Sequence, residues 1–404
     1  MIHSPLRSSQ RRRIAVLGYI VRGPIGGMWW SDVHYLLGLR ALGHDVYFVE
    51  DSDDYPSCFD PVRNRTDTDP RYGLAFAQRT LAHIGFDDRW AYFDAHTQRW
   101  HGPAGERIVP WCATAEVVLN LGGVNPLRPW LLGVPTRVLV DKDPVFTQIR
   151  HLTDAGARAR ARQHTAFFTF GENVGRPECT IPDDGLPWQP TRHPIALDHW
   201  PPASPASAGP FTTVMQWDSY SARVYGGYRY GMKSDSFGPY LDLPMRAAHR
   251  FELAVGDHQA PRAALRSHGW TVVNPMQPPW DPWTYQHYIQ QSKAEFSVAK
   301  QGYVTTRTGW FSERSAAYLA SGRPVLTQET GSAAWLPTGA GILTFATPDE
   351  ALAGVEDVAR GYRAHCAAAR NVADAYFDAR TVLASLLEAA CATPPREHRP
   401  AARP

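Results

Sequence analysis

Short, continuously apolar runs alternate with helix-spaced segments along most of this chain. The first run, 14–20, lacks polar alternation, as expected of a strand that is buried on both faces. A glycine-rich loop over 22–27 follows, then helical spacing over 33–42 that ends at Gly43, then a second apolar run over 46–49. This strand–helix–strand unit is the building block of a doubly wound parallel sheet.

The same pattern continues through two series of strand signals. The first series adds the runs at 117–121, 137–140 and 167–170. The second comprises the runs at 211–217, 251–255, 271–273, 296–299, 324–326 and 342–345, with helix-spaced segments between them. The sequence therefore predicts an α/β fold of two Rossmann-like, doubly wound parallel-sheet domains that face each other across a cleft.

Composition sets the expected domain boundaries. Residues 1–12 are expected to be disordered, and 13–175 to form the first domain, with the Asp-rich, aromatic stretch 52–111 interpreted as an insertion. The stretch 176–210 is dense in Pro, Ala, Ser and Gly and is a predicted linker. The second domain is predicted over 211–375, followed over 376–404 by a C-terminal helix and a disordered tail.

The charge balance excludes some classes of protein. Forty-one Lys and Arg face 39 Asp and Glu, so the net charge of +2 does not give the global field of a dedicated nucleic-acid or acidic-membrane binder. No stretch approaches the ~20 apolar residues of a membrane helix. The five Cys are scattered without a C-x-x-C motif, which argues against disulfides and a zinc site. A cytoplasmic protein without a bound metal is expected. Only four of the basic residues are lysines: Lys142, Lys233, Lys293 and Lys300.

The segment 306–331, TRTGWFSERSAAYLASGRPVLTQETG, has the most specific pattern in the chain. A glycine loop with hydroxyl and Arg groups leads into a helix whose N-terminal end favours anions, and Gly-Arg-Pro-Val then leads into a strand. This segment resembles the donor-nucleotide region of GT-B glycosyltransferases. Gly26-Gly27 after the first strand and the two-domain plan extend the resemblance over most of the chain. The chain is most similar to a bacterial branch grouped with spore-maturation-protein-like glycosyltransferases.

The resemblance implies a hexosyltransferase that moves a sugar from a nucleoside diphosphate, with UDP expected, to an acceptor hydroxyl. The sugar nucleotide is a co-substrate, and no cofactor is expected. Two phosphates in a partly dry cleft need cations and a helix end to neutralise them. Many relatives carry a ribose-binding Glu where this chain has Ala317; Glu313, one turn earlier, is either its substitute or a charge that matches the helix dipole. The predicted donor-binding residues are Gly26, Gly27, Arg229, Lys233, Lys300, Arg307, Gly309, Ser312, Glu313, Arg314, Glu329 and Thr330.

The acceptor must lose a proton during transfer, and an inverting enzyme supplies a base for it. Asp32 and His34, predicted near the start of the first helix, are the candidates. Asp32 could instead match the helix dipole and His34 could pack passively, and a retaining enzyme would need neither. The predicted acceptor-binding residues are Trp29, Trp30, Asp141 and Asp143.

Two other functions remain open from the sequence, a sugar-nucleotide epimerase and a non-catalytic binder of sugar nucleotides. The acceptor is a small molecule, a saccharide or a modified nucleobase, so that nucleic acid is a partner only as acceptor. The protein is a monomer or a homodimer. Half of the tryptophans are predicted to border the cleft, namely Trp29, Trp30, Trp217, Trp280, Trp283, Trp310 and Trp335.

Overall fold

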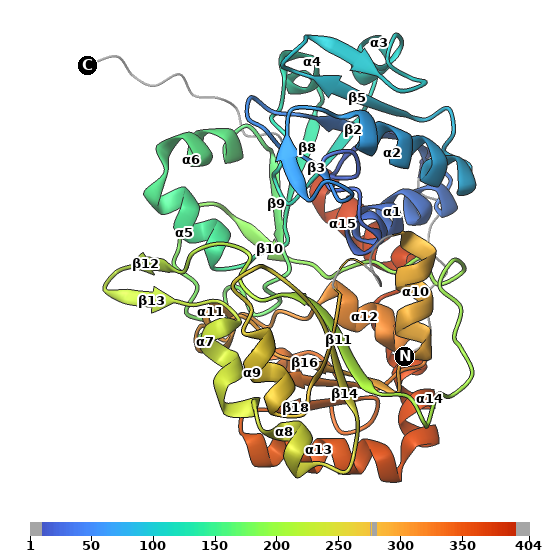
Figure 1. Ribbon diagram of the computed structural model, residues 1–404. Helices are drawn as coiled ribbons and strands as arrows, with labels where there is room; N and C mark the ends of the chain where they lie inside the picture. The colour runs from blue at the N-terminus through green and yellow to red at the C-terminus, as the bar shows by residue number, and fades with distance from the viewer. Residues whose placement is uncertain (1–9, 275, 277–280, 393–404) are drawn as a thin grey trace.

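The computed structural model describes residues 10–274, 276 and 281–392 and shows two α/β halves, each built around one sheet (Figure 1). The first sheet has the strand order β10-β9-β8-β7-β1-β2-β5-β6. Its neighbouring strands are parallel except for β6, which runs antiparallel to β5. Its strands are β1 (Arg13–Leu17), β2 (Asp45–Asp51), β5 (Trp90–Asp94), β6 (Arg99–His101), β7 (Val117–Leu121), β8 (Thr136–Asp141), β9 (Ala166–Thr169) and β10 (Trp188–Pro190).

The second sheet is entirely parallel and has the order β15-β14-β11-β16-β17-β18. Numbered along the chain, this order is that of a Rossmann-like sheet, and the inner strands of the first sheet repeat it. The prediction of two doubly wound parallel sheets is confirmed. The strands are β11 (Phe211–Gln216), β14 (Phe251–Gly256), β15 (Thr271–Val273), β16 (Ala294–Ser297), β17 (Val325–Gln328) and β18 (Ile342–Phe345).

Helices cover the sheets and connect their strands. In the first half they are α1 (Gly26–Ala41), α2 (Arg71–His83), α3 (Ile108–Cys112), α4 (Pro129–Leu132), α5 (Phe146–Thr153) and α6 (Ala155–Ala161). In the second half they are α7 (Ser234–Phe237), α8 (Leu243–Arg246), α9 (Arg262–Ser267), α10 (Pro282–Gln291), α11 (Gln301–Thr305), α12 (Glu313–Ala320), α13 (Pro348–Arg360) and α14 (Tyr362–Tyr376). None of the helices in the described ranges is both long and apolar enough to cross a membrane.

Two stretches differ from the sequence interpretation. The stretch 52–111 is not wholly an insertion, because β5 within it pairs in parallel with β2 as an integral strand of the first sheet. The predicted linker 176–210 contains β10, which extends the same sheet beside β9. β10 is only three residues long and contains Gln189 and Pro190, so it has no continuous apolar run. β5 does have one, over 90–93, but it stands within an Asp-rich, aromatic stretch that resembles an insertion. A hairpin, β3 (Cys58–Asp60) with β4 (Arg65–Asp67), does lie outside the sheet.

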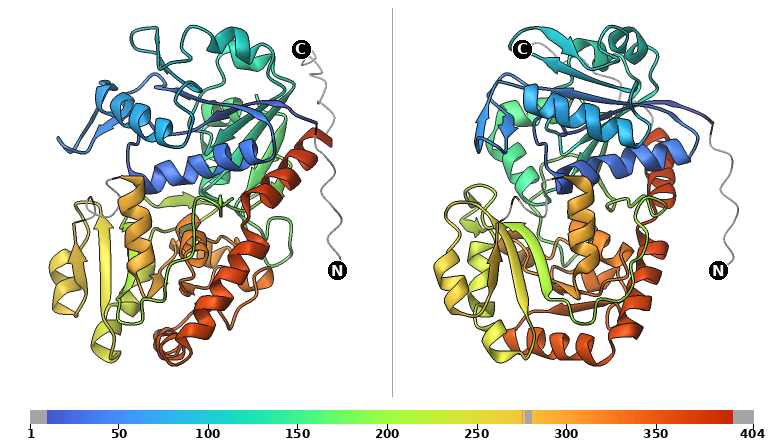
Figure 2. Two further views of the ribbon diagram at one scale, coloured as in Figure 1. Left: turned by 90° about the vertical axis from the view of Figure 1, so that its right-hand side faces the viewer. Right: turned by 45° about the vertical axis from the view of Figure 1, so that its right-hand side comes forward.

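The end of the chain returns to the first half. The last helix, α15 (Ala379–Ala392), packs against α1 (Figure 2). A Cβ on Gly38 of α1 would lie 2.6 Å from Leu383 and 2.7 Å from Ala379, so glycine permits this close approach. Where the chain crosses between the halves, Ile195 N donates to Phe377 O at 2.7 Å, and Ala379 N donates to Ile195 O at 2.9 Å. The largest apolar cluster accordingly contains residues from both halves.

Candidate active site at the domain junction

The carboxyl edges of the two sheets face each other, because the segments after their strands are in contact. Asp143, after β8, accepts a hydrogen bond from Lys300 Nζ, after β16, at 2.8 Å. Asn173, after β9, donates from Nδ2 to the carbonyl oxygens of Arg307 at 3.0 Å and Gly331 at 2.9 Å. We call this region the domain junction. It is the edge at which open parallel sheets bind their ligands.

Lys233 lies at this junction between the two-stranded hairpin β12 (Arg223–Tyr225)–β13 (Tyr228–Tyr230) and α7. Its side chain is half-buried, and it makes no hydrogen bond or ion pair with any described residue. Burial first, and then the nearby charges of Arg314 and Lys300, lower the pKa of Lys233 to about 7. A half-buried ammonium beside two other cations is disfavoured, so the amine loses its proton near pH 7 unless an anion joins it.

Arg314 contributes positive charge, and each of its three nitrogens already donates one hydrogen bond within the second half. Its Nε donates to Glu295 Oε1 at 2.6 Å, its Nη1 to Val214 O at 2.7 Å and its Nη2 to Ser297 Oγ at 2.8 Å. All of these partners belong to the second half, and Arg314 and Glu295 are buried. Arg314 therefore anchors α12 to the sheet, and its charge lowers the pKa of Lys233.

The N-terminus of α12 points a carboxylate toward the same region. Ser312 is the N-cap, and its Oγ accepts from Arg314 N at 3.2 Å. Glu313, in the first turn, is half-buried and has no hydrogen bond or ion pair among the described residues. Its negative charge is close enough to Lys233, and to Tyr35 in α1, to act in the direction that raises the pKa of each. Ala317 is buried in the core.

The remaining predicted donor residues in the second half shape loops. Gly309 has a φ of 76° and donates its N–H to Thr330 O at 2.8 Å, while Thr330 Oγ1 donates to Trp310 O at 2.6 Å. Glu329 accepts from the N–H of Gly331. Arg307 keeps an exposed side chain without a hydrogen bond or ion pair to the described residues.

Arg229, Gly26 and Gly27 are occupied by contacts within the protein. Arg229 is exposed on the β12–β13 hairpin, beside α5 in Figure 1, and is paired with Asp235 at 2.7 Å. Gly26 and Gly27 begin α1, which starts well before the predicted position 33. A Cβ on Gly26 would lie 2.4 Å from the carbonyl oxygen of Asp281, so this glycine lets α1 approach α10.

Asp32 is buried in the second turn of α1, and each of its carboxylate oxygens accepts one hydrogen bond. Its Oδ1 accepts from Lys142 Nζ at 2.8 Å, and its Oδ2 accepts from Tyr19 N at 2.6 Å. Lys142 also donates to Ser31 Oγ at 2.8 Å. The arrangement orients an ion-paired carboxylate at the carboxyl edge of the first sheet.

His34 has the surroundings of a packing residue. Burial lowers its pKa to about 3, so that the ring is neutral. Its Nδ1 accepts from Ala196 N at 3.1 Å, which leaves the proton on Nε2. The ring stacks on Trp30 at 5.0 Å and lies 5.7 Å from Trp200. No free basic nitrogen is left to accept a proton, so the structure does not support His34 as the base.

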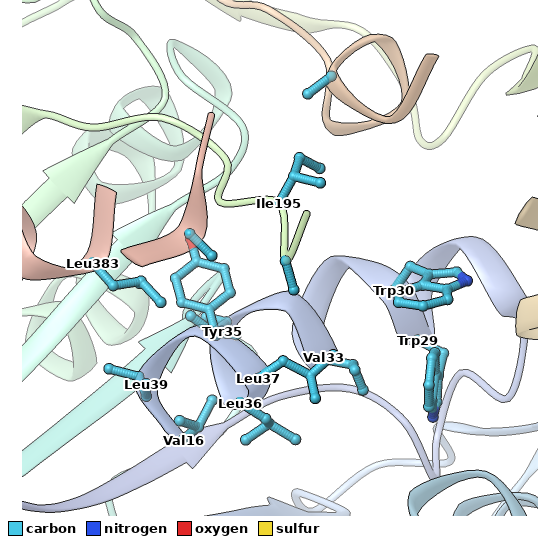
Figure 3. Packing of buried hydrophobic residues seen from close by; sticks show 14 of the residues in the cluster. Val16, Trp29, Trp30, Val33, Tyr35, Leu36, Leu37, Leu39, Ile195 and Leu383 are labelled. Carbon is cyan, nitrogen blue, oxygen red and sulfur yellow. The ribbon is translucent and has the colours of Figure 1, made fainter. Parts of the chain in front are cut away.

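Trp29, Trp30 and Asp141 are also buried rather than open to an acceptor. Trp29 and Trp30 pack edge to face at 4.9 Å on α1, as Figure 3 shows, and Trp30 Nε1 donates to Pro282 O of α10 at 2.7 Å. Asp141 accepts from the side chains of Thr147, Thr169 and Gln148 and from a backbone N–H, which organises the β8–α5 turn.

The other tryptophans predicted at the cleft also pack internally. Trp217 contacts Phe237, Trp283 contacts Trp29 and His83, and Trp310 contacts Tyr303. Trp335 Nε1 donates to Gly309 O at 2.8 Å. Trp280 lies outside the described residues.

Several residues at the junction were not singled out from the sequence. Glu50, completely buried at the end of β2, accepts from the backbone N–H groups of Ile20, Val21 and Arg22 and from Arg22 Nε. It therefore fixes the loop before α1. Lys142 pairs with Asp32, and the hydroxyls of Tyr220 and Tyr303 donate to Asp143. Of these residues, only Lys142 could have been recognised from the sequence, because it is one of four lysines and stands between two aspartates.

The described residues contain no group of three or more His, Cys, Asp or Glu side chains placed to hold a metal ion. Lys233, Lys300, Glu313 and Asp143 are among the charged side chains that the fold gathers at the junction. Such a set can bind an anion and hydroxyl groups together.

In its fold the chain is similar to solved glycosyltransferase structures. An alpha-glucosyltransferase in complex with UDP-glucose and DNA containing an abasic site matches with a TM-score of 0.59 at 8% identity, over 95% of this chain and 100% of that chain. Anabaena HepE in complex with UDP and glucose matches with a TM-score of 0.53 at 12% identity, over 94% and 99%. AviGT4, a glycosyltransferase involved in avilamycin A biosynthesis, matches with a TM-score of 0.52 at 15% identity, over 95% and 98%. No protein-family model and no curated protein matches the chain.

These likenesses extend over nearly the whole of each chain, so both domains and their order are shared. The protein therefore has the GT-B fold, and this confirms the fold class that the sequence predicts. At these identities the comparison defines the fold alone.

Proposed function

We propose that the protein is a GT-B glycosyltransferase that transfers a sugar from a UDP-sugar to an acceptor hydroxyl. The second domain would bind the donor, and the first domain would present the acceptor. The structural neighbours support this proposal, because they are glycosyltransferases, two of them in complex with UDP or UDP-glucose. None of them is an epimerase, and we do not propose that reaction.

Lys233 is the observation that carries the proposal. Its ammonium is enclosed, lacks a partner among the described residues and lies near Lys300 at the ligand-binding edge of the second sheet. A diphosphate placed there would neutralise Lys233 and receive charge-assisted hydrogen bonds from it. Glu313 nearby would accept hydrogen bonds from hydroxyl groups of the nucleotide or sugar.

On the acceptor side, Asp32 stays the predicted base. Its pairing with Lys142 at 2.8 Å and its hydrogen bond from Tyr19 N hold the carboxylate in one orientation. The acceptor is proposed as a small molecule, a saccharide or a modified nucleobase, the last in keeping with the DNA-bound neighbour. The sequence of 306–331 further supports the proposal that the protein belongs to the spore-maturation-protein-like branch. We also propose that it is cytoplasmic and that it uses the sugar nucleotide as a co-substrate, without a cofactor.

Calorimetric titration with a panel of UDP-sugars tests the proposal. We expect wild-type protein to bind at least one of them and Lys233→Met to lose that binding. Lys293→Met is the matched control, because Lys293 precedes β16 at the opposite, amino edge of the same sheet and is also largely buried. Absence of binding by every UDP-sugar would contradict the proposal, and so would equal losses in both variants. A donor that binds would then be incubated with acceptor candidates, and mass spectrometry would detect transfer.

A further inference from the structure

Asp143 of the first domain is bound by three donors from the second. Its Oδ1 accepts from Lys300 Nζ at 2.8 Å and from the hydroxyl of Tyr303, and its Oδ2 accepts from the hydroxyl of Tyr220. Lys300 Nζ also lies 3.0 Å from Tyr220 OH. The second domain thus presents an anion site built from one ammonium and two phenol groups, and a carboxylate of the opposite domain fills it.

The surroundings of Lys300 make a permanent anion necessary. Its side chain is 11% exposed, and its Nζ lies 4.9 Å from the ring centre of Phe146, 4.5 Å from that of Tyr220 and 5.3 Å from that of Tyr303. An ammonium enclosed in this way is costly without a counter-ion. Burial, followed by the charge of Asp143, raises the pKa of both tyrosines, so their hydroxyls stay protonated and remain donors.

Asp143 pairs with Lys300 but not with Lys233, the other lysine of the second domain at the junction. Lys233 is close enough for the charge of Lys300 to act on it, and no described carboxylate pairs with it. The diphosphate of a sugar nucleotide carries two negative charges and several acceptor oxygens. It could therefore neutralise Lys233 and Lys300 together, which Asp143 does not do.

We propose that Asp143 is an internal stand-in for the donor diphosphate, which displaces it from Lys300, Tyr220 and Tyr303 when the donor binds. This inference rests on the proposed function. In the free protein the carboxylate neutralises Lys300 and ties the two domains together. A ligand with one negative charge only replaces the charge of the carboxylate that it displaces, so it gains little binding free energy. The contact between Asp143 and Lys300 therefore favours diphosphate donors over monophosphate donors.

Asp143→Asn tests the inference, because it removes the competing charge and keeps the shape of the side chain. We expect the variant to bind UDP-glucose, or whichever UDP-sugar the wild type binds, with at least fivefold higher affinity than the wild type, as measured by calorimetry. Asp54→Asn is the control: it also removes one paired carboxylate from the first domain, 3.1 Å from Arg128, and should change the affinity less than twofold. Lys300→Met should weaken binding at least tenfold, and Asp143→Asn should give no gain in that background.

Hydrogen exchange supplies a second readout. Bound UDP-sugar should raise the exchange of the backbone N–H groups at 143–150 in wild-type protein, since the contact with Lys300 is lost. If the wild type binds a UDP-sugar while Asp143→Asn binds it equally or more weakly, or if exchange at 143–150 falls on binding, the inference is overturned and the proposed function stands. If no UDP-sugar binds to the wild type or to any variant, both fail.

Discussion

The carboxyl edges of the two sheets differ in whether their charged side chains are paired within the protein. In the first domain Asp32 is paired with Lys142, and Glu50 with Arg22 and three backbone N–H groups. In the second domain the side chains of Lys233 and Glu313 make no hydrogen bond or ion pair within the part of the chain that the structure describes. Unpaired charges in a half-buried position are unfavourable, so folding alone does not account for them. At the first edge the protein itself supplies the partners of these charges, and at the second the proposed donor would supply those of Lys233 and Glu313.

The largest effect on stability is expected at the carboxyl edge of the first sheet, where the charges are paired within the protein. Glu50→Ala removes the acceptor of four hydrogen bonds and leaves the fully buried Arg22 without its counter-ion. We expect a loss of about 3–5 kcal/mol in the free energy of unfolding, measured by urea denaturation. Glu116→Ala breaks the partly exposed pair with Arg12 and should cost at most about 1 kcal/mol. Equal losses would show that the buried contacts of Glu50 contribute no more to stability than a partly exposed ion pair.

Lys233→Met should have the opposite effect on stability. The folded protein disfavours the ammonium, because the pKa of Lys233 falls from 10.5 to about 7, while the unfolded chain keeps the proton up to higher pH. Removing the side chain's charge should therefore raise the Tm of the free protein by a few degrees at pH 7. It should also weaken UDP-sugar binding by roughly 100-fold, about the worth of a charge-assisted contact.

Differential scanning fluorimetry and calorimetry measure the two effects, with Lys293→Met as the control. A fall in Tm together with unchanged affinity would mean that Lys233 supports the fold and does not face the donor.

The affinity for a UDP-sugar should depend on pH through Lys233. Below pH 7 the free protein carries the ammonium; above pH 7 the amine is neutral, and binding the diphosphate requires uptake of a proton. Affinity should therefore fall as pH rises from 6 to 9, by up to about tenfold per unit. UDP-glucose suits the titration, because its diphosphate diester does not itself titrate in this range. Lys233→Arg, which stays charged, should flatten the profile, and a wild-type profile as flat as that of the variant would refute this role.

Glu313→Gln should give the smallest effect and separates two interpretations of this carboxylate. A ribose ligand predicts about fivefold weaker binding of UDP and no further loss with 2′-deoxy-UDP, since one hydrogen bond is worth about 1 kcal/mol. A charge that only matches the dipole of α12 predicts a slightly lower Tm and UDP binding that is unchanged or tighter. Calorimetry with both nucleotides distinguishes the two outcomes.

Much of the fold could be predicted because the inner strands are locally encoded. The apolar runs at 211–217, 251–255 and 342–345 correspond to β11, β14 and β18. β5 and β10 were missed because their pairing depends on the neighbouring strands β2 and β9 and not on their own composition. Gly26 was assigned to a loop because two glycines disfavour a helix. It lies in α1, where its lack of a side chain admits α10.

The candidate site was predictable at the level of residue type and position along the chain. Lys233 and Lys300 stand out as rare lysines after predicted strands, and both are at the junction. His34 and Asp141 were also predicted as site residues, yet one packs among aromatic rings and the other organises a turn. The sequence shows which charges reach a sheet edge, but burial and hydrogen bonding decide whether they remain available.

The sequence by itself determined two parallel α/β domains and a set of cations at their loops, because strand and helix periodicity and strand ends are local properties. Only the tertiary structure decided which of those charges are paired. Lys142 meets Asp32 across 110 residues, and Lys300 meets Asp143 across 157. The first contact arises from packing within the first domain and the second from packing of one domain on the other, and the same packing left the side chains of Lys233 and Glu313 without partners among the described residues.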